Sequence, residues 1–271
     1  MQSAWGEDRI RASELSMANS YVGPPVAVGV TLSVAHRELR RNLRAPGSQT
    51  ALEPSEANDD KLTEKGTPRM KLTTTTQVSV DGVMQGPGGP EEDERGTFKR
   101  GGWAHFDNEA GAAMGEIYKR ADAFLFGRRT YEIFARSWGT WSDPGDDPIW
   151  KALHTKPKYV ASTTLTNPRW ANTTVLSGQL ADAVRELKAK PGRELQVHGS
   201  GVLFRWLRDN HLVDEMNLFI FPVVVGQGTR LFPDSGPDIA LQVVDSRVTP
   251  KGITIQVSRP TGRPQYSTAT P

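Results

Sequence analysis

Apolar and polar positions change their spacing twice between residues 194 and 233. The run 195–197 is short and apolar-rich, which predicts a buried strand. Beyond it, apolar residues recur three and four positions apart, at Val202, Leu203, Trp206 and Leu207. That spacing predicts a helix with one apolar face. A second apolar run at 216–225 predicts another strand, so this stretch is expected to form a strand, a turn, a helix and a strand.

Gly199, Ser200 and Gly201 form the turn between the first of these strands and the helix. A helix N-terminus presents unpaired N–H groups and a partial positive charge, and glycines let an anion approach the backbone. The triplet therefore indicates either a phosphate site or a tight turn that needs glycine for its geometry alone. It is not the dinucleotide fingerprint G-x-G-x-x-G, because the third glycine is absent.

The same rules predict further elements between residues 70 and 260. An alternating Thr- and Val-rich run predicts a strand from Lys71 that ends at Asp81 and Gly82. Other strands are predicted at 123–126, 158–161, 173–176, 239–246 and 252–258. Helices are predicted at 109–120, 128–138, 149–153 and 180–187. Strands that alternate with helices and end in a strand pair predict an α/β fold, with a mostly parallel sheet and antiparallel C-terminal edge strands.

Three segments lack this periodicity. Residues 1–69 mix Ser, Pro, Gly, Glu and Arg, so we expect a disordered or loosely packed N-terminal extension. We expect 261–271 to form a flexible tail, which leaves 70–260 as the folded domain. Inside that domain, 84–103 is a long Gly- and Pro-rich loop, and loops of this length are usually functional or disordered.

Composition and charge exclude several classes of site. The 271 residues carry a formal net charge of +2 with scattered basic residues, which gives no footprint for nucleic acid. The chain has no cysteine, so disulfides, zinc–thiolate sites and thiol catalysis are excluded. Its five histidines form no H-x-x-x-H pair, so we predict no metal site. No apolar run approaches the length of a membrane span, so we predict no membrane association.

Four stretches, in this order, resemble the dihydrofolate-reductase-like superfamily. They are KLTTTTQVSVDGVMQGPGG, LFGRRTYEIF, YVASTTL and QVHGSGVLFRWL followed by LVDEMNLFIFPVVVGQGTRLFP. The nearest branch is the reductase domain found C-terminally in the bifunctional riboflavin-biosynthesis deaminase-reductase, together with its stand-alone relatives. The resemblance covers residues 70–258 and implies that family's three-layer fold around a central sheet.

The resemblance also implies that the protein binds NADPH. It places the cofactor's 2′-phosphate at a helix N-terminus formed by Gly127, Arg128, Arg129 and Thr130. A dianionic phosphate suits the forked guanidinium of Arg128 or Arg129. Further contacts are expected at Ser162, Thr163, Gly199, Ser200, Gly201 and Val202. Without the resemblance, the arginines would be interpreted as solvated surface charges, and Ser162 and Thr163 as turn residues.

Three polar residues are candidates for contact with the substrate. Asp81 matches the family signature S-x-D-G and is also the candidate catalytic acid, because a partly buried carboxylate can have a raised pKa. Alternatively, it is a turn residue before Gly82. Asp107 begins the first predicted helix and is either a substrate contact or an N-cap. His198 stands where the riboflavin branch usually carries glutamate, and it is either a substrate contact or a packed strand-end histidine.

The sequence thus predicts a cytoplasmic, NADPH-dependent reductase that acts on a small pyrimidine- or pteridine-like heterocycle. The first named activity is reduction of 5-amino-6-(5-phosphoribosylamino)uracil, as in riboflavin biosynthesis. Dihydrofolate reduction is the alternative activity, and a nucleotide-binding protein without chemistry is the alternative class. Aromatic residues beside the loops are expected either to stack on the heterocycle or to belong to the core, namely Trp103, Phe106, Trp138 and Trp141. The family resemblance also leads us to expect a homodimer.

Overall fold

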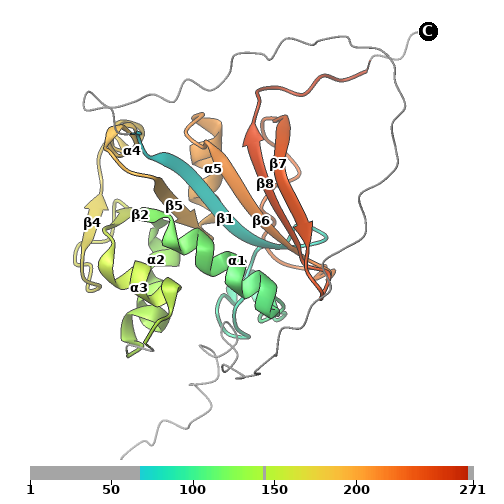
Figure 1. Ribbon diagram of the computed structural model, residues 1–271, viewed down its shortest axis with the longest axis horizontal. Helices are drawn as coiled ribbons and strands as arrows, with labels where there is room; N and C mark the ends of the chain where they lie inside the picture. The colour runs from blue at the N-terminus through green and yellow to red at the C-terminus, as the bar shows by residue number, and fades with distance from the viewer. Residues whose placement is uncertain (1–67, 143–144, 268–271) are drawn as a thin grey trace, which may run out of the picture.

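A computed structural model describes residues 68–142 and 145–267. An eight-stranded sheet forms its centre, with the strand order β4-β3-β2-β5-β1-β6-β8-β7 (Figure 1). The strands are β1 Lys71–Ser79, β2 Ala121–Gly127, β3 Lys158–Ala161, β4 Thr173–Leu176, β5 Glu194–His198, β6 Glu215–Phe221, β7 Leu241–Val248 and β8 Thr254–Pro260. Neighbours from β4 to β6 pair in parallel, whereas β8 pairs antiparallel with both β6 and β7. This is the mostly parallel sheet with antiparallel C-terminal edge strands that the pattern predicted.

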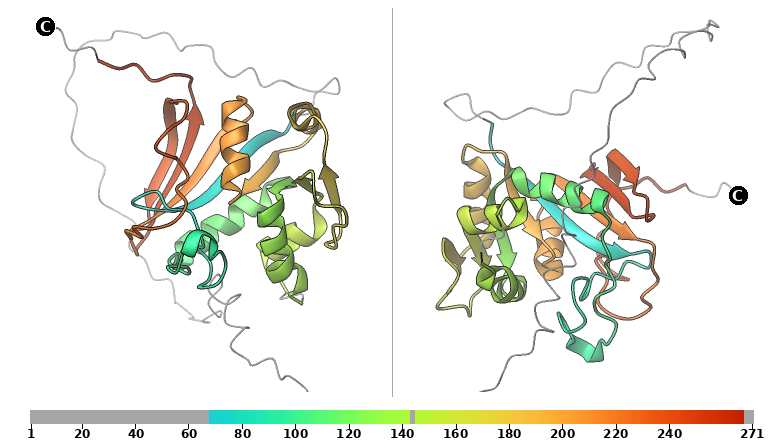
Figure 2. Two further views of the ribbon diagram at one scale, coloured as in Figure 1. Left: turned by 180° about the vertical axis from the view of Figure 1, so that it is seen from behind. Right: turned by 60° about the horizontal axis from the view of Figure 1, so that its bottom comes forward.

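Helices cover both faces of the sheet, which makes the three-layer α/β arrangement. They are α1 Asn108–Lys119, α2 Arg128–Ser137, α3 Pro148–Thr155, α4 Leu180–Ala189 and α5 Gly201–Asp209, with short 3-10 turns η3 Arg95–Thr97 and η4 Trp138–Thr140. In Figure 1, α1 crosses the near face of the sheet, and α5 lies on the opposite face, which Figure 2 shows from behind. One buried apolar cluster joins α1 and α3 to the sheet, and a second joins α4 and α5 to it.

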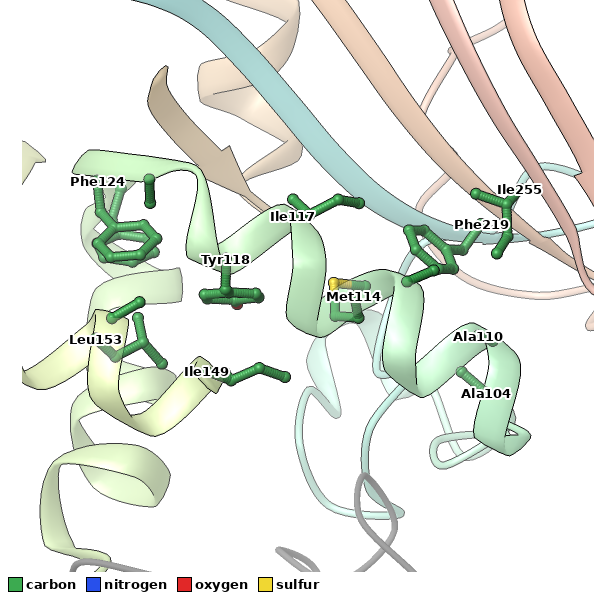
Figure 3. Close-up of a cluster of buried hydrophobic side chains, with 14 of the residues drawn as sticks. Ala104, Ala110, Met114, Ile117, Tyr118, Phe124, Ile149, Leu153, Phe219 and Ile255 are labelled. Atoms are coloured by element: carbon green, nitrogen blue, oxygen red, sulfur yellow. The ribbon is translucent and has the colours of Figure 1, made fainter. Parts of the chain in front are cut away.

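The amino-acid sequence explains why α1 forms and why it docks. The Asp107 side chain accepts a hydrogen bond from the amide of Ala110 and caps the first turn. Apolar residues then recur at helical spacing and are buried, at Ala110, Ala113, Met114, Ile117 and Tyr118. Figure 3 shows Ile117 beneath the sheet and Tyr118 directed towards Phe124 of β2 and Leu153 of α3. The helix therefore fixes the position of its own N-terminus and of the loop before it.

The structure differs from the predicted elements at the end of β6. The strand ends at Phe221, although the apolar run continues to Val225. Pro222 follows immediately and lacks an amide hydrogen, so it cannot continue a central ladder. The amide of Val225 donates instead to a carboxylate oxygen of Asp81, at 3.0 Å. The segment after β6 thus joins the loops at the carboxyl end of β1.

The predicted domain boundaries fall partly outside the described residues. Most of the expected N-terminal extension, residues 1–67, lies there, and so do residues 268–271 of the expected tail. The described residues before β1 contact the domain, since Arg69 forms a bridge with Pro191. Thr261, in the described part of the tail, donates its amide hydrogen to the carbonyl of Ala240 at 2.9 Å. Among the described residues, no helix has both the length and the apolar character that a membrane span requires.

Candidate active site

The turns after β2 and β5 are joined directly to each other. β2 and β5 are neighbours in the sheet, and a helix begins immediately after each of them. The amide of Gly127 donates to Ser200 Oγ at 3.0 Å, and the amide of Ser200 donates to Thr130 Oγ1 at 3.1 Å. These reciprocal bonds hold the N-termini of α2 and α5 side by side. The amides of a helix's first turn have no partner within the helix, so the paired termini suit an anion.

The glycines of the second turn have a geometric reason to be there. Gly199 has φ +62°, a backbone conformation that favours glycine, and Ser200 follows with φ +30°. Gly201 is packed closely, because an added Cβ would lie 2.5 Å from Met84 Sδ. The geometry of a tight turn therefore gives these glycines a reason of their own, whether or not the turn also binds an anion. Val202, the next predicted contact, is 72% exposed on the first turn of α5.

Arg128 lies towards the end of β3. Its Nη1 donates to Thr164 Oγ1 at 2.6 Å, and its Nε pairs with Glu132 at 2.7 Å. Ser162 Oγ accepts hydrogen bonds from the amides of Thr164 and Leu165, at 3.2 and 3.0 Å, so it shapes the turn. Guanidinium and hydroxyl groups are the donors that a phosphate monoester requires. The sequence-based list missed Thr164, although it completes the hydroxyl run Ser162, Thr163, Thr164 after a predicted strand.

Arg129 lies on a different side of the turn from Arg128. Its Nη2 donates to Asp93 Oδ1 at 2.8 Å, and Asp93 belongs to the loop between β1 and α1. The sequence treated the two arginines as equivalent candidates for one phosphate. The structure gives them different neighbours, because Arg128 contacts Thr164 after β3 and Glu132 of its own helix, whereas Arg129 contacts Asp93 of the loop before α1.

Asp81 requires a correction, because its carboxylate has no raised pKa. Oδ1 accepts a hydrogen bond from Ser79 Oγ at 2.6 Å and another from the amide of Val225 at 3.0 Å. Oδ2 accepts from the amide of Gly226 at 2.8 Å. The Ser79 hydroxyl and these amides outweigh the effect of burial and lower the pKa of Asp81 to about 2. The carboxylate is therefore ionised at neutral pH and ties the end of β1 to the segment after β6.

Asp107 is the N-cap of α1, which was the alternative to a substrate contact. Oδ1 accepts from the amide of Ala110 at 2.8 Å, and Oδ2 accepts from the amide of Lys251 at 3.0 Å. Burial raises the pKa of Asp107, but hydrogen bonds from Thr249 and from these amides outweigh it and lower the pKa below its usual value. Both oxygens are occupied within the fold, so the structure gives this residue a structural role.

His198 is a packed histidine, which corrects the predicted substrate contact. The residue is 3% exposed, and its ring stacks on Tyr118, with 4.2 Å between ring centroids. Nε2 lies 3.0 Å from Gln196 Oε1, an acceptor, so Nε2 carries the proton in that bond. Burial lowers the pKa of His198 to about 3. The ring is therefore neutral and lies in the core beneath α1.

Three of the four aromatic residues beside the loops, Trp103, Phe106 and Trp138, pack against the core, and Trp141 contacts Trp138. Trp103 and Phe106 both contact Phe221, with ring centroids 5.8 and 5.1 Å apart. The Trp103 indole donates to the carbonyl of Gln85 at 2.8 Å, and its ring stays half-buried. Trp138 is likewise packed, partly buried, against the apolar cluster under α1. Within residues 68–142 and 145–267, no group of three or more His, Cys, Asp or Glu side chains could hold a metal ion.

Proteins of known sequence and structure resemble this chain over its described domain. The uncharacterized protein YyaP of Bacillus subtilis (strain 168) is 29% identical over 181 residues, which cover 65% of this chain and 87% of that protein. A Shewanella sp. PV-4 structure, provisionally assigned to riboflavin biosynthesis, is 23% identical, with a TM-score of 0.52 over 71% of this chain and 99% of that one. A pyrimidine reductase-like protein of Corynebacterium diphtheriae is 13% identical, with a TM-score of 0.49 over 71% and 92%.

The first of these structures supports the fold described above, which the sequence had related to the dihydrofolate-reductase-like superfamily. The sequence profile of the RibD C-terminal domain matches residues 70–255. That span begins one residue before β1 and ends within β8, so it contains all the turns described above. The chain therefore belongs to the RibD C-terminal domain family.

Proposed function

We propose that this protein is an NADPH-dependent reductase of a pyrimidine- or pteridine-like heterocycle, with an activity like that of 5-amino-6-(5-phosphoribosylamino)uracil reductase. The observation that carries the proposal is the joined pair of helix N-termini after β2 and β5, in a chain of the RibD C-terminal domain family. Such a pair, with an arginine and hydroxyls beside it, matches the anionic groups of a phosphorylated dinucleotide.

The side chains divide between two phosphate positions. Arg128, Ser162 and Thr164 would hold the 2′-phosphate, because they meet after β3. The first turns of α2 and α5 would hold the pyrophosphate, with Thr130 and Ser200 keeping the two turns in register. When bound, NADPH supplies a hydride, and the protein's contribution is to orient the two reactants.

The proton for the reduced substrate must come from a group other than Asp81. A carboxylate whose pKa is about 2 is ionised at neutral pH and has no proton to give. Asp81 instead fixes the backbone at Val225 and Gly226, beside the end of β1. We therefore propose that ordered water delivers the proton.

One observation favours an alternative, a nucleotide-binding protein without chemistry. Asp81, Asp107 and His198, the three predicted substrate residues, are all engaged within the fold. Dihydrofolate reduction gains no such support, because the acid at the start of the first helix is the N-cap Asp107.

An assay of NADPH oxidation distinguishes the reductase from the nucleotide-binding protein. Purified protein is mixed with NADPH and, in turn, with phosphoribosyl aminopyrimidines and dihydropterins, and the loss of NADPH absorbance is followed. We expect oxidation with an aminopyrimidine and none with the protein omitted. Tight NADPH binding with no oxidation for any heterocycle would establish the binding protein instead.

The outer edge of the sheet supports the homodimer as a further proposal. β7 is the terminal strand, and three of its valines are exposed by 51%, 40% and 64%, namely Val243, Val244 and Val248. An open strand edge with exposed apolar residues is a common surface for pairing with a second chain. We propose that a second copy covers this edge. Sedimentation at micromolar concentration tests it, and a monomer alone would refute it.

A further inference from the structure

The loop between β1 and α1 is built across the joined turns. Met84 lies against Gly201, at the first turn of α5. Gln85 is buried, and its Nε2 donates to the carbonyls of Asp93 and Arg95 at 3.1 and 2.9 Å. Phe98, 1% exposed, anchors the far side of the loop in a small apolar cluster with Val83 and Val225. The loop therefore holds its polar residues at defined positions beside the helix termini.

A single buried carboxylate in this loop holds two arginines together. The Asp93 side chain is 9% exposed and forms a fork with Arg95, from Nε to Oδ1 at 2.9 Å and from Nη2 to Oδ2 at 2.6 Å. Its Oδ1 also accepts from Arg129 Nη2 at 2.8 Å. The side chains of Arg95 and Arg129 remain 53% and 45% exposed. Asp93 thus fixes the two guanidinium groups on one side and leaves them open to solvent on the other.

The charge balance of this arrangement favours an anion. Two guanidinium groups share one carboxylate, so Asp93 balances only one of their two positive charges. Each guanidinium carries five N–H groups, and those bonded to Asp93 are only a part of them. Glu92 accepts from the amides of Gly88 and Gly89, and Glu94 pairs with Lys99 at 2.6 Å, so in the described structure neither carboxylate forms an ion pair with Arg95 or Arg129.

We infer that Arg95 is a further binding residue of this site, held by Asp93 beside Arg129 so that both guanidinium groups contact one phosphoryl group. The inference rests on the proposed function. The phosphoryl group is the dinucleotide's pyrophosphate or the phosphate of a phosphoribosyl substrate, which share the same chemistry. Asp93 is a positioning residue, because it acts through the two arginines.

Binding titrations of the full chain test the inference. The probes are ADP-ribose, NADH and NADPH for the pyrophosphate, and ribose 5-phosphate for the substrate phosphate. Arg95→Ala should lower the affinity for either the pyrophosphate probes or ribose 5-phosphate, on the order of tenfold or more. The reason is the loss of charge-assisted hydrogen bonds to phosphate. The matched control is Lys99→Ala, a cation of the same loop that is 71% exposed and paired with Glu94. It should leave all affinities unchanged.

The titrations distinguish the two possible sources of the phosphoryl group, the pyrophosphate of the dinucleotide and the phosphate of the substrate. Weaker binding of all three pyrophosphate probes assigns Arg95 to the pyrophosphate, and weaker binding of ribose 5-phosphate alone assigns it to the substrate. If Arg95→Ala binds every probe as the unaltered protein does, the inference is wrong. If the unaltered protein binds no probe, both the inference and the proposed function fail. If it binds the dinucleotides but oxidises no NADPH, only the proposed chemistry fails.

The role of Asp93 is tested through its coupling to Arg95. Asp93→Asn keeps the size of the side chain and removes the charge that aligns the guanidinium groups. We expect Arg95→Ala to have a much smaller effect in the Asp93→Asn background than in the unaltered protein, because misaligned arginines contribute less. Arg95→Lys should restore only part of the affinity, since an ammonium lacks the fork. Equal effects of Arg95→Ala in both backgrounds would show that Asp93 does not position Arg95.

Discussion

Thr130 Oγ1 accepts the amide hydrogen of Ser200 at 3.1 Å and so joins two helix starts that are 70 residues apart in the chain. Ser200 returns the contact by accepting from the amide of Gly127. Neither bond can be inferred from the local sequence around either residue. Because both turns depend on these bonds, we predict that the two helix termini act as one anion site rather than as two independent ones.

Replacing Thr130 with Val should therefore weaken the binding of both NADPH and NADH. Valine has a similar shape but removes the acceptor for the Ser200 amide, and an unsatisfied amide of this kind costs about 1–3 kcal/mol. We expect the affinities for NADPH and NADH to fall by similar factors, measured by titration. Thr140→Val is the control, because its exposed hydroxyl bonds only to carbonyls of its own helix turn. A loss confined to NADPH would contradict the joined-site argument.

Arg128 should decide the choice between NADPH and NADH. The two cofactors differ by the 2′-phosphate, and Arg128 lies with the hydroxyls after β3. Arg128→Ala should weaken NADPH binding by about ten- to a hundredfold and leave the affinity for NADH nearly unchanged. Arg129→Ala should leave the preference for NADPH over NADH unchanged, because Arg129 lies on the side of Asp93 and away from the hydroxyls after β3. Arg185→Ala, which removes a similar exposed arginine paired with Asp182, is the control. An unchanged preference in Arg128→Ala would refute the placement of the 2′-phosphate.

The fold could be predicted from spacing because its elements carry their own signals. The strands at 158–161 and 173–176 have the predicted bounds. The antiparallel C-terminal pair is present as predicted, but both of its strands begin and end two residues later than predicted. Asp107 marks the start of α1 by a local mechanism, since its oxygen reaches an amide three residues on. The prediction for β6 runs four residues past its observed end at Phe221, because an apolar run does not reveal which partner its amides take.

The candidate site could be predicted only where neighbouring residues in the sequence determine it. The turns at Gly127 and Gly199 were placed by strand–helix spacing and by the family resemblance. The states of Asp81 and His198 depend on partners brought by the fold, namely the Val225 amide 144 residues away and the Tyr118 ring of α1. The bond between Asp93 and Arg129 likewise joins a loop and a helix that the sequence separates by 36 residues.

Asp81 should stabilise the protein in a way that depends on pH. Its pKa is about 2 in the folded protein and 3.8 without the fold's hydrogen bonds, so the stabilisation is present above about pH 4 and is lost as the pH falls towards 2. Asp81→Asn should lower the free energy of unfolding by about 1–2 kcal/mol at neutral pH. This difference in stability between the two proteins should vanish as the pH approaches about 2. Urea unfolding across this range measures it, and a difference independent of pH would contradict the assignment.

His198 should make the protein less stable in mild acid. Its pKa is about 3 in the folded protein and 6.5 in the unfolded chain. Between these values the unfolded chain binds a proton that the folded protein does not, so stability falls as the pH is lowered, by at most about 1.4 kcal/mol per pH unit. His198→Gln keeps a donor for Gln196 but cannot titrate. Urea unfolding between about pH 7 and about pH 4 should therefore show a weaker loss of stability in His198→Gln than in the unaltered protein. Parallel losses in the two proteins would mean that His198 is protonated in the fold and is not the buried, neutral ring described above.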